Sequence, residues 1–338
     1  MCRDKSRHGT HECVRHILLL NMFYSIRHLT QFRYDSAVSE SLMELRMQPR
    51  SEGPQRCLSF QLSVDPRAMV YQYRDYLGNS VHHFDVPGKH ILLRIVAEAL
   101  VEVQVVPDPP KRLGADAWTQ LDALVATGDY WEMLMPSQFA QATPALLELA
   151  EELSVQRRDD PLAFLRELNE NIYNWFDYVP KATHVDSPID HAIETRRGVC
   201  QDFAHIMTTL VRHVKIPCRY VSGYLYPQEK HKDRSSEGAT HAWVEALLPG
   251  LGWVGFDPTN NLMAGERHIR TAIGRDYADV PPTRGIFKGK AASELKVSVR
   301  VAPSDAPPPP EADLNAPPQW EPATEVEQYD VQQQQQQQ

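Results

Sequence analysis

The sequence predicts an α+β protein in which an all-β domain precedes a domain of helices and strands. Hydrophobic residues repeat with period two from residue 23 to 106, and with a helical period from residue 115 onward. Between these regions, Pro107 to Pro110 contains three prolines, which cannot continue a sheet ladder. We therefore expect a β-rich domain at 22–106 and a mixed domain at 107–300.

The first domain alternates apolar and polar residues in segments of strand length. Its alternating apolar and aromatic positions include Tyr24, Ile26 and His28, then Phe32 and Tyr34, then Leu58, Phe60, Leu62 and Val64. Leu77-Gly78-Asn79 separates two further strand-like segments, as a hairpin turn does. We expect about six strands in a sandwich-like arrangement.

The second domain begins with helices and continues with strands. Helical periodicity is found at 115–126, 143–153 and 161–177, and a further helix is expected from Cys200 to about Val214. Strands are expected at Cys218–Tyr226, His241–Leu248 and Trp253–Asp257.

The two ends of the chain carry no fold pattern. Residues 1–21 precede the first patterned strand, and we expect an unstructured extension there. From residue 301 to 338 the chain has eight prolines, a final run of seven glutamines and no basic residue. Such a composition is typical of a disordered tail.

Composition and charge exclude several functional classes. No apolar run approaches the roughly 20 residues of a membrane-spanning helix, and no secretory signal is recognisable, so we expect a cytoplasmic protein without membrane contact. Of the net charge of −9, seven negative charges lie in residues 302–338, which leaves −2 for the rest. Without a cluster of Lys and Arg, nucleic acid is not an expected partner.

The five cysteines also limit the possibilities. They are widely spaced and contain no CxxC pair, which argues against a disulfide framework and a structural zinc site. We expect no metal and no other cofactor. At least one cysteine is a candidate for thiol chemistry.

Cys200 is that candidate, because Arg197-Gly198-Val199 delivers it to the first turn of a helix. Thiolate is the nucleophilic form of cysteine, and the free N–H groups and positive dipole of a helix N-terminus stabilise it. The same N–H groups can hold an oxyanion. Most free cysteines are small buried hydrophobes, so the residue alone leaves both interpretations open.

His241 and Asp257 are the candidate partners of this thiol. His241 opens a strand after a polar stretch, which suits a general base, and Asp257 ends the following strand. They share a face only if the hairpin loop has three or five residues, or if a glycine such as Gly255 forms a bulge. Taken singly, one of 14 histidines and an aspartate before a proline are not specific.

Together these segments resemble the transglutaminase-like, papain-related superfamily. The resemblance lies in Gly-Val-Cys200-Gln-Asp-Phe-Ala-His, in the strand that reaches Tyr224, in Thr-His241-Ala-Trp-Val-Glu and in Phe-Asp257-Pro-Thr-Asn. It covers residues 160–262, while residues 24–106 resemble the β-rich domain that precedes the core in bacterial members. It implies a papain-like core with Cys200 as nucleophile, His241 as base and acid, and Asp257 as the group that orients the imidazole.

The resemblance also suggests residues that line the cleft. Cross-linking members use an upstream tryptophan near the oxyanion, for which Trp175 is the candidate, although packing at a helix end is the alternative. Tyr178 and His184 lie in the loop that leads toward the nucleophile, where they either line the cleft or are ordinary loop residues.

Three neighbouring residues have simpler interpretations. Asp202 is expected to cap the helix that Cys200 begins. His205 is expected to lie off the Cys200 face of that helix, about 140° around it. Cys218 is expected to be an inert residue on an apolar strand.

These features imply an amide-bond enzyme that acts on proteins or peptides through a thioester. A member with this domain order is expected to be a cysteine protease or amidase, with water as acceptor. A protein-glutamine γ-glutamyltransferase, with an amine as acceptor, is the alternative. A non-catalytic peptide-binding module and a metal site formed by Cys200, His241 and Asp257 also stay open.

Overall fold

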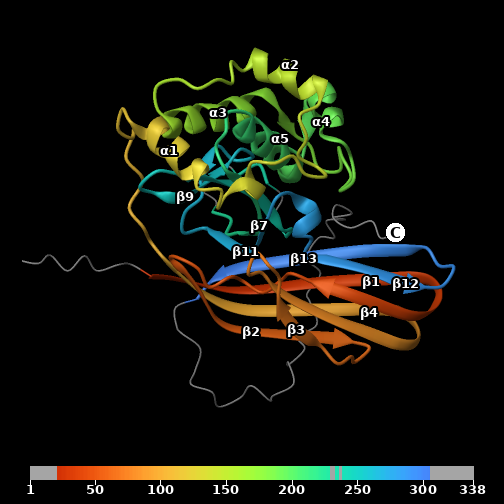
Figure 1. Ribbon diagram of the computed structural model, residues 1–338. Coiled ribbons are helices and arrows are strands. Elements are labelled where there is room, and N and C mark those ends of the chain that lie inside the picture. Colours follow the sequence, from red (N-terminus) through yellow and green to blue (C-terminus); the bar gives the residue numbers. More distant parts are fainter. Residues whose placement is uncertain (1–20, 229–232, 236–237, 305–338) are drawn as a thin grey trace, which may run out of the picture.

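The computed structural model describes residues 21–228, 233–235 and 238–304, and it contains a β unit and a mixed unit (Figure 1). The expected extension at 1–21, except Asn21, and the tail beyond 304 lie outside the described residues. Within the described ranges, no helix has the length and apolar character needed to cross a bilayer.

The β unit is a six-stranded antiparallel sheet, in which β12, β1, β4 and β2 lie in this order while β13 pairs with β1 and β3 pairs with β4 (Figure 1). Its strands are β1 (Asn21–Leu45), β2 (Gln55–Asp65), β3 (Tyr71–Arg74), β4 (Ser80–Gln104), β12 (Thr283–Lys288) and β13 (Ser293–Pro303). Both β1 and β4 are 25 residues long. They form the centre of the sheet.

β1 and β4 bend where their pairing register shifts, between Arg33 and Val38. Irregularities of this kind bend a strand and increase its twist. Phe32 and Leu93 on one side of the bend share a hydrophobic cluster with Met43 on the other side. The sheet therefore folds over its own core, which gives the sandwich-like all-β unit that the sequence predicts.

The last two strands in the described part of the chain belong to the β unit. β12 pairs with the second half of β1, and β13 pairs with the first half, from Tyr24↔Pro303 to Tyr34↔Ser293. The second domain was expected to end at residue 300 and the tail to begin at 301. In the structure, β12 and β13 return to the sheet of the β unit, and β13 continues to Pro303. The reason is that an antiparallel partner is selected by pairing across the whole chain, which local periodicity does not contain.

The mixed unit lies between these two parts of the sheet, and its described residues form the α-helices and seven strands. Its α-helices are α1 (Ala117–Ala126), α2 (Pro144–Glu152), α3 (Pro161–Trp175), α4 (Ile189–Thr195) and α5 (Cys200–His213). Its strands are β5 (Asp177–Tyr178), β6 (Arg197–Gly198), β7 (Cys218–Leu225), β8 (His241–Leu248), β9 (Gly252–Asp257), β10 (Leu262–Met263) and β11 (His268–Gly274). The helices and strands expected in this region are confirmed, whereas α4, β11 and the two-residue strands β5, β6 and β10 were not predicted.

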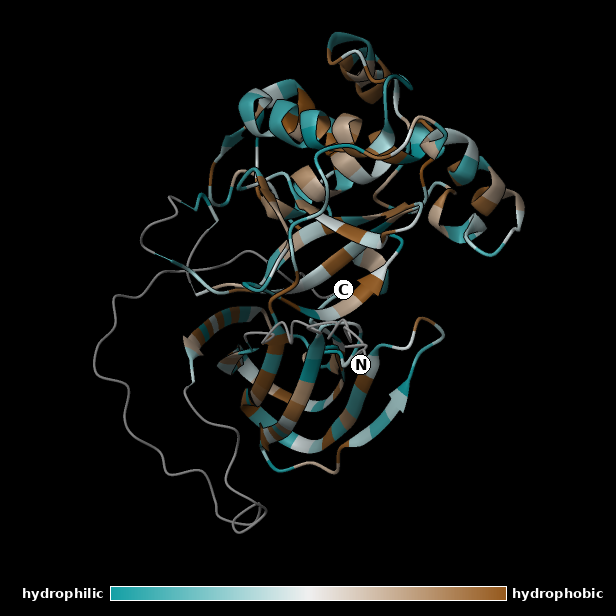
Figure 2. Ribbon diagram, turned by 90° about the vertical axis from the view of Figure 1, so that its left-hand side faces the viewer, coloured by the Kyte–Doolittle hydropathy of each residue, from teal (hydrophilic) through white to brown (hydrophobic). Residues whose placement is uncertain are grey.

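α5 is the central helix of this unit. It packs against a five-stranded sheet with the order β10-β9-β8-β7-β11, and α2, α3 and α4 pack against its other side (Figure 1). Every residue of α5 except His213 is buried. Figure 2 shows the helices lying over this sheet, with brown hydrophobic residues recurring in both. The position of Cys200 at the start of α5 is therefore fixed by packing around the whole helix.

Two side-chain amides join the β unit to β11. Gln55 donates from Nε2 to the Arg270 carbonyl at 2.9 Å and accepts the Arg270 N–H at 2.8 Å. Asn79 makes the same pair of bonds with Ile273, both at 2.9 Å. β11 is the outermost strand of its sheet, so these amides pair with its free edge as a neighbouring strand would.

Candidate functional site

Cys200 is the first residue of α5 and is 5% exposed. Gly198 precedes it, where an added Cβ would stand 2.9 Å from Oδ2 of Asp202 and 3.1 Å from the Phe203 ring. The turn therefore needs a glycine. The first N–H groups of a helix lack intrahelical acceptors, so the thiol lies at the positive end of α5.

Asp202 caps this helix start, as predicted. Its Oδ2 accepts the Val199 N–H at 2.8 Å and the Thr183 hydroxyl at 2.5 Å. Burial raises the pKa of Asp202 to about 6, and these hydrogen bonds act in the opposite direction. The turn before Cys200 is thus held by a buried carboxyl group that ionises closer to neutral pH than an ordinary aspartate.

The β8–β9 hairpin brings His241 and Asp257 together. Only Pro249, Gly250 and Leu251 separate the two strands, and Val244 pairs with Phe256. This three-residue loop satisfies the register condition derived from the sequence, without a bulge. His241 Nε2 lies 2.8 Å from Asp257 Oδ2.

The Asp257 carboxylate is fully buried and accepts hydrogen bonds at both oxygens. Oδ1 accepts the main-chain N–H groups of Thr259 at 3.0 Å and Asn260 at 3.3 Å. Oδ2 accepts the Asn260 side-chain amide at 2.8 Å, in addition to His241. Burial alone would raise the pKa of Asp257, but the charge and hydrogen bond of His241, and after them the hydrogen bond of His268, hold it well below its usual range. Asp257 is therefore ionised.

His241 is positioned between this carboxylate and Cys200. Burial lowers the pKa of His241, but Asp257, and after it the Cys200 thiol, raise it to about 10. Nε2 is engaged by Asp257, while Nδ1 is buried and has no partner of normal hydrogen-bond geometry among the described residues. Nδ1 is therefore the nitrogen available to the thiol, and a charged imidazolium beside it stabilises a thiolate.

His268 is a member of this cluster that sequence reasoning missed. Its Nε2 lies 3.2 Å from Asp257 Oδ2, and the imidazoles of His241 and His268 lie 6.2 Å apart. One histidine among 14, at the start of an unpredicted strand, gives no local signal. Only the order of β8, β7 and β11 in the sheet brings it to Asp257.

His241, Asp257 and His268 also form a potential set of metal ligands, with ligand atoms within 4.8 Å of one another. Imidazole and carboxylate are suitable zinc ligands. However, Asp257 Oδ2 already faces both imidazoles and the Asn260 amide. Since the NH₂ group of Asn260 that faces Oδ2 can only donate, the arrangement fits a carboxylate held by hydrogen bonds better than one that binds a cation.

The predicted cleft residues occupy different positions. Trp175 lies under the Arg196 guanidinium, 4.6 Å from it, and lines a shallow surface pocket with residues of α2 and α3. Tyr178 pairs with Gly198 in the short β5–β6 ladder, two residues before Cys200. His184 is exposed in a turn closed by its N–H bond to Ser187. Tyr178 is thus the candidate placed next to the nucleophile turn.

The two neighbouring residues of α5 and β7 are as expected. His205 is buried, stacks on Phe139 at 5.5 Å and accepts the Tyr277 N–H, and burial lowers its pKa to about 4. Cys218 is fully buried, and burial raises its pKa to about 12. Neither residue is suited to the chemistry of Cys200.

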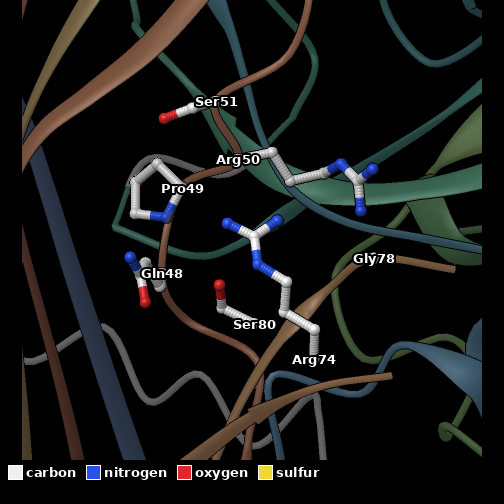
Figure 3. A pocket seen from close by; sticks show the side chains of 7 residues that line it. All are labelled: Gln48, Pro49, Arg50, Ser51, Arg74, Gly78 and Ser80. Carbon is white, nitrogen blue, oxygen red and sulfur yellow. The ribbon is translucent and has the colours of Figure 1, made fainter. Parts of the chain in front are cut away.

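A small polar cavity lies elsewhere, at the segment that joins β1 to β2 (Figure 3). Its volume is about 30 Å³, and its lining includes Gln48, Arg50 and Arg74. Arg50 is already paired with Glu52 and with Asn79. A cavity of this size holds one or two water molecules, so it is not a substrate site.

Two protein-family models match this chain. The "Bacterial transglutaminase-like N-terminal region" matches residues 24–102, which form most of β1 to β4. The "Transglutaminase-like superfamily" matches residues 148–258, which include Cys200, His241 and Asp257. The first match therefore lies in the β unit and the second in the mixed unit.

Whole proteins similar to this chain come from several bacteria. An uncharacterized protein of Mycobacterium leprae is 32% identical over 275 residues, covering 81% of this chain and 96% of its own. A protein-glutamine gamma-glutamyltransferase of Pseudomonas aeruginosa is 35% identical over 158 residues, covering 43% of this chain and 23% of its own. A crystal structure of a candidate cysteine protease from Cytophaga hutchinsonii shares the fold, with a TM-score of 0.69, 24% identity, and coverage of 85% of this chain and 92% of its own.

Proposed function

Since this chain belongs to the transglutaminase-like superfamily, we propose that it is a thiol-dependent amide-bond enzyme that acts on proteins or peptides. Cys200 is the nucleophile, His241 the general base and acid, and Asp257 the group that orients His241. The observation that supports this most is the buried 2.8 Å contact between His241 Nε2 and Asp257 Oδ2, which leaves Nδ1 as the nitrogen available to the thiol. In the proposed reaction the nucleophile acts with a base that an orienting group holds in place.

The first half of the reaction forms a thioester. The Cys200 thiolate attacks the amide carbonyl, and the carbonyl oxygen takes the negative charge. Main-chain N–H groups at the start of α5 stabilise this oxyanion. His241 then gives its Nδ1 proton to the departing nitrogen, so ammonia or an amine leaves and the acyl group stays on sulfur.

The second half transfers the acyl group to an acceptor. His241, now neutral at Nδ1, removes a proton from the acceptor as that group attacks the thioester carbonyl. The carbon–sulfur bond breaks, and the proton on the imidazolium is shared again with the thiolate. Water as acceptor gives a carboxylic acid, and a primary amine gives a new amide.

Hydrolysis, by a cysteine protease or amidase, is our first candidate, and amine transfer is the second. The P. aeruginosa relative is named a protein-glutamine gamma-glutamyltransferase, which supports the second. Cys200 is only 5% exposed, and a carboxamide at the tip of a glutamine side chain reaches such a thiol more easily than a main-chain amide flanked by chain on both sides. A glutaminyl substrate is consistent with both candidates.

Alkylation of the protein with iodoacetamide at about pH 6 tests the reactive pair, because ordinary thiols are protonated there. We expect selective labelling of Cys200, read by mass spectrometry, and its loss in His241→Ala. His213→Ala, which changes the exposed last residue of α5, is the matched control. Slow and equal labelling of all cysteines would contradict the proposal, and it would favour a non-catalytic binding module.

A glutaminyl peptide, with and without a primary amine, separates the two reactions. Hydrolysis releases ammonia and forms glutamate in the absence of amine. Transfer incorporates the amine and is faster when amine is present. Cys200→Ala must abolish both products, and activity that survives this substitution would refute the assigned nucleophile.

A further inference from the structure

We propose that His268 is a positioning residue for Cys200 and His241, which holds the Asp257 carboxylate through a hydrogen bond from Nε2. This inference rests on the proposed function and adds a fourth side chain to it. His268 begins β11 and is 5% exposed. Among the described residues its side chain is hydrogen-bonded to Asp257 and Gly265, so it would act through Asp257.

The hydrogen bonds of His268 determine its tautomer. Nδ1 lies 3.3 Å from the main-chain N–H of Gly265, which can only donate, so Nδ1 must be the unprotonated nitrogen. Nε2 therefore carries the proton and donates to Asp257 Oδ2 at 3.2 Å. His268 is a one-directional donor to the carboxylate, fixed by a main-chain group on its other side.

This bond completes the restraint of Asp257. Oδ2 accepts His241 and Asn260 at 2.8 Å and His268 at 3.2 Å. Asn260 follows Asp257 on the same loop, and His241 is the group to be oriented. His268 is thus the donor that ties the carboxylate to a different strand, which keeps it aligned when His241 gains and loses its proton.

Trp243 fixes the spacing between the two imidazoles. Its ring lies parallel to His241, 26° between planes at 6.0 Å, and edge-on to His268 at 5.2 Å. The side chain is fully buried. The buried indole therefore restrains the positions of both imidazoles relative to Asp257.

β11 itself is anchored by the β unit. Gln55 pairs with both main-chain groups of Arg270, two residues after His268. Tyr24 and Val101 of the β unit also pack in one hydrophobic cluster with Ile269. The β unit therefore supports the proposed site through the strand that supplies His268.

Three ionisable groups among the described residues act on His268. They are Asp257, His241 and Arg267, and burial, the largest influence, lowers the pKa of His268. Arg267 is paired with Asp233 at 2.8 Å. His268 is therefore neutral at pH 7, which agrees with the tautomer that its bonds require.

Two amide substitutions separate positioning from simple structural support. In His268→Asn the side-chain oxygen can still accept the Gly265 N–H, but no donor reaches Asp257. In His268→Gln the longer side chain places its amide nitrogen near the position of Nε2 and restores the donor, while the contact with Gly265 is lost. If His268 has a purely structural role, His268→Asn should keep more of the wild-type reactivity of Cys200. If it has a positioning role, His268→Gln should keep more.

The readout is the alkylation rate of Cys200 at about pH 6 and at about pH 9.5, above the usual pKa of a thiol. We expect His268→Asn to be roughly tenfold slower than wild type at the lower pH, the size of one lost hydrogen bond to a charged group, and similar at the higher pH. His268→Gln should stay within about threefold at both. The kcat for a glutaminyl peptide should follow the low-pH rate, with KM unchanged.

The inference is overturned if His268→Asn reacts like wild type, or if both variants slow equally at both pH values. Nitrogen-15 NMR of wild-type histidines gives a test without variants: a proton on Nδ1 of His268 at pH 7 would also overturn it. Unselective labelling in the wild type would instead refute the proposed function. The two failures are therefore distinguishable.

Discussion

Asp257→Asn is the substitution with the largest expected effect on the proposed reaction. Oδ1 accepts two main-chain N–H groups, from Thr259 and Asn260, so the oxygen of the new side chain must stay there. Its NH₂ group then takes the place of Oδ2 and faces His241 Nε2. Because that amide donates, His241 must accept at Nε2 and carry its proton on Nδ1. The nitrogen that faces Cys200 is thereby blocked as a base.

The size of the effect follows from the pKa of His241. It is about 10 in this site against an ordinary 6.5, although burial alone would lower it. At about 1.4 kcal/mol for each tenfold change in proton affinity, the net stabilisation of the imidazolium is on the order of 5 kcal/mol. Most of it comes from Asp257. We therefore expect kcat/KM to fall by roughly 10³-fold or more in Asp257→Asn, with little change in KM.

The loss of activity in Asp257→Asn is measured by peptide turnover, and the change in Cys200 reactivity by alkylation at a series of pH values. Wild-type Cys200 should react below pH 7, whereas Asp257→Asn should react only as the free thiol ionises. Because the folded pKa of His241 is raised, its contribution to stability is full below 6.5 and is lost as the pH rises through about 10. The difference in unfolding free energy between the two proteins should shrink over that range. An Asp257→Asn protein within tenfold of wild-type activity would refute the reasoning.

Three further predictions concern stability and are read by urea unfolding. Gly198→Ala should lower the free energy of unfolding by about 1 to 3 kcal/mol because its Cβ would stand 2.9 Å from Asp202 Oδ2, whereas Gly265→Ala, with nothing within 4 Å, should not. Burial raises the pKa of Asp202 from 3.8 to about 6, so the folded state binds this proton more tightly and stability should fall as the pH rises between these values. That fall should vanish in Asp202→Asn. Asn79→Leu should cost about 2 to 4 kcal/mol because it leaves a main-chain N–H and C=O of β11 unpaired, while Gln72→Leu, which loses a bond between exposed side chains, should cost under about 1 kcal/mol.

Each of these predictions has a clear contradictory outcome. Equal unfolding midpoints for Gly198→Ala and Gly265→Ala would show that the turn before Cys200 tolerates a side chain. A pH slope that survives in Asp202→Asn would assign it to another group. An Asn79→Leu protein as stable as Gln72→Leu would show that the amide contributes no more than a surface side chain.

The local part of the site could be predicted from the sequence because it depends on short-range geometry. A glycine before a helical period places Cys200 at the start of α5, and a three-residue loop fixes the face that His241 and Asp257 share. The position of Cys200 and the shared face of His241 and Asp257 each depend on a segment of about 20 residues or fewer. The helix cap by Asp202 belongs to the same class.

The remaining features depend on pairings between distant segments. β13 alternates Val297, Val299 and Val301, a strand pattern, yet nothing local says that its partner is β1, more than 250 residues earlier. His268 reaches Asp257 only because β11 pairs with β7 in the same sheet as β9, which local sequence does not reveal. For such contacts the sheet order has to be known before any single residue can be interpreted.

The amides of Gln55 and Asn79 have a consequence for assembly. An exposed strand edge is a template for intermolecular pairing and aggregation, and proteins commonly cover it. Here the cover is supplied by another unit of the same chain, and at the opposite end of the sheet β10 is only two residues long. A fragment that contains the mixed unit alone would expose the β11 ladder, so we expect it to aggregate. The mixed unit would therefore depend on the β unit for protection of its sheet edge, and we expect the two units to be needed together in one chain.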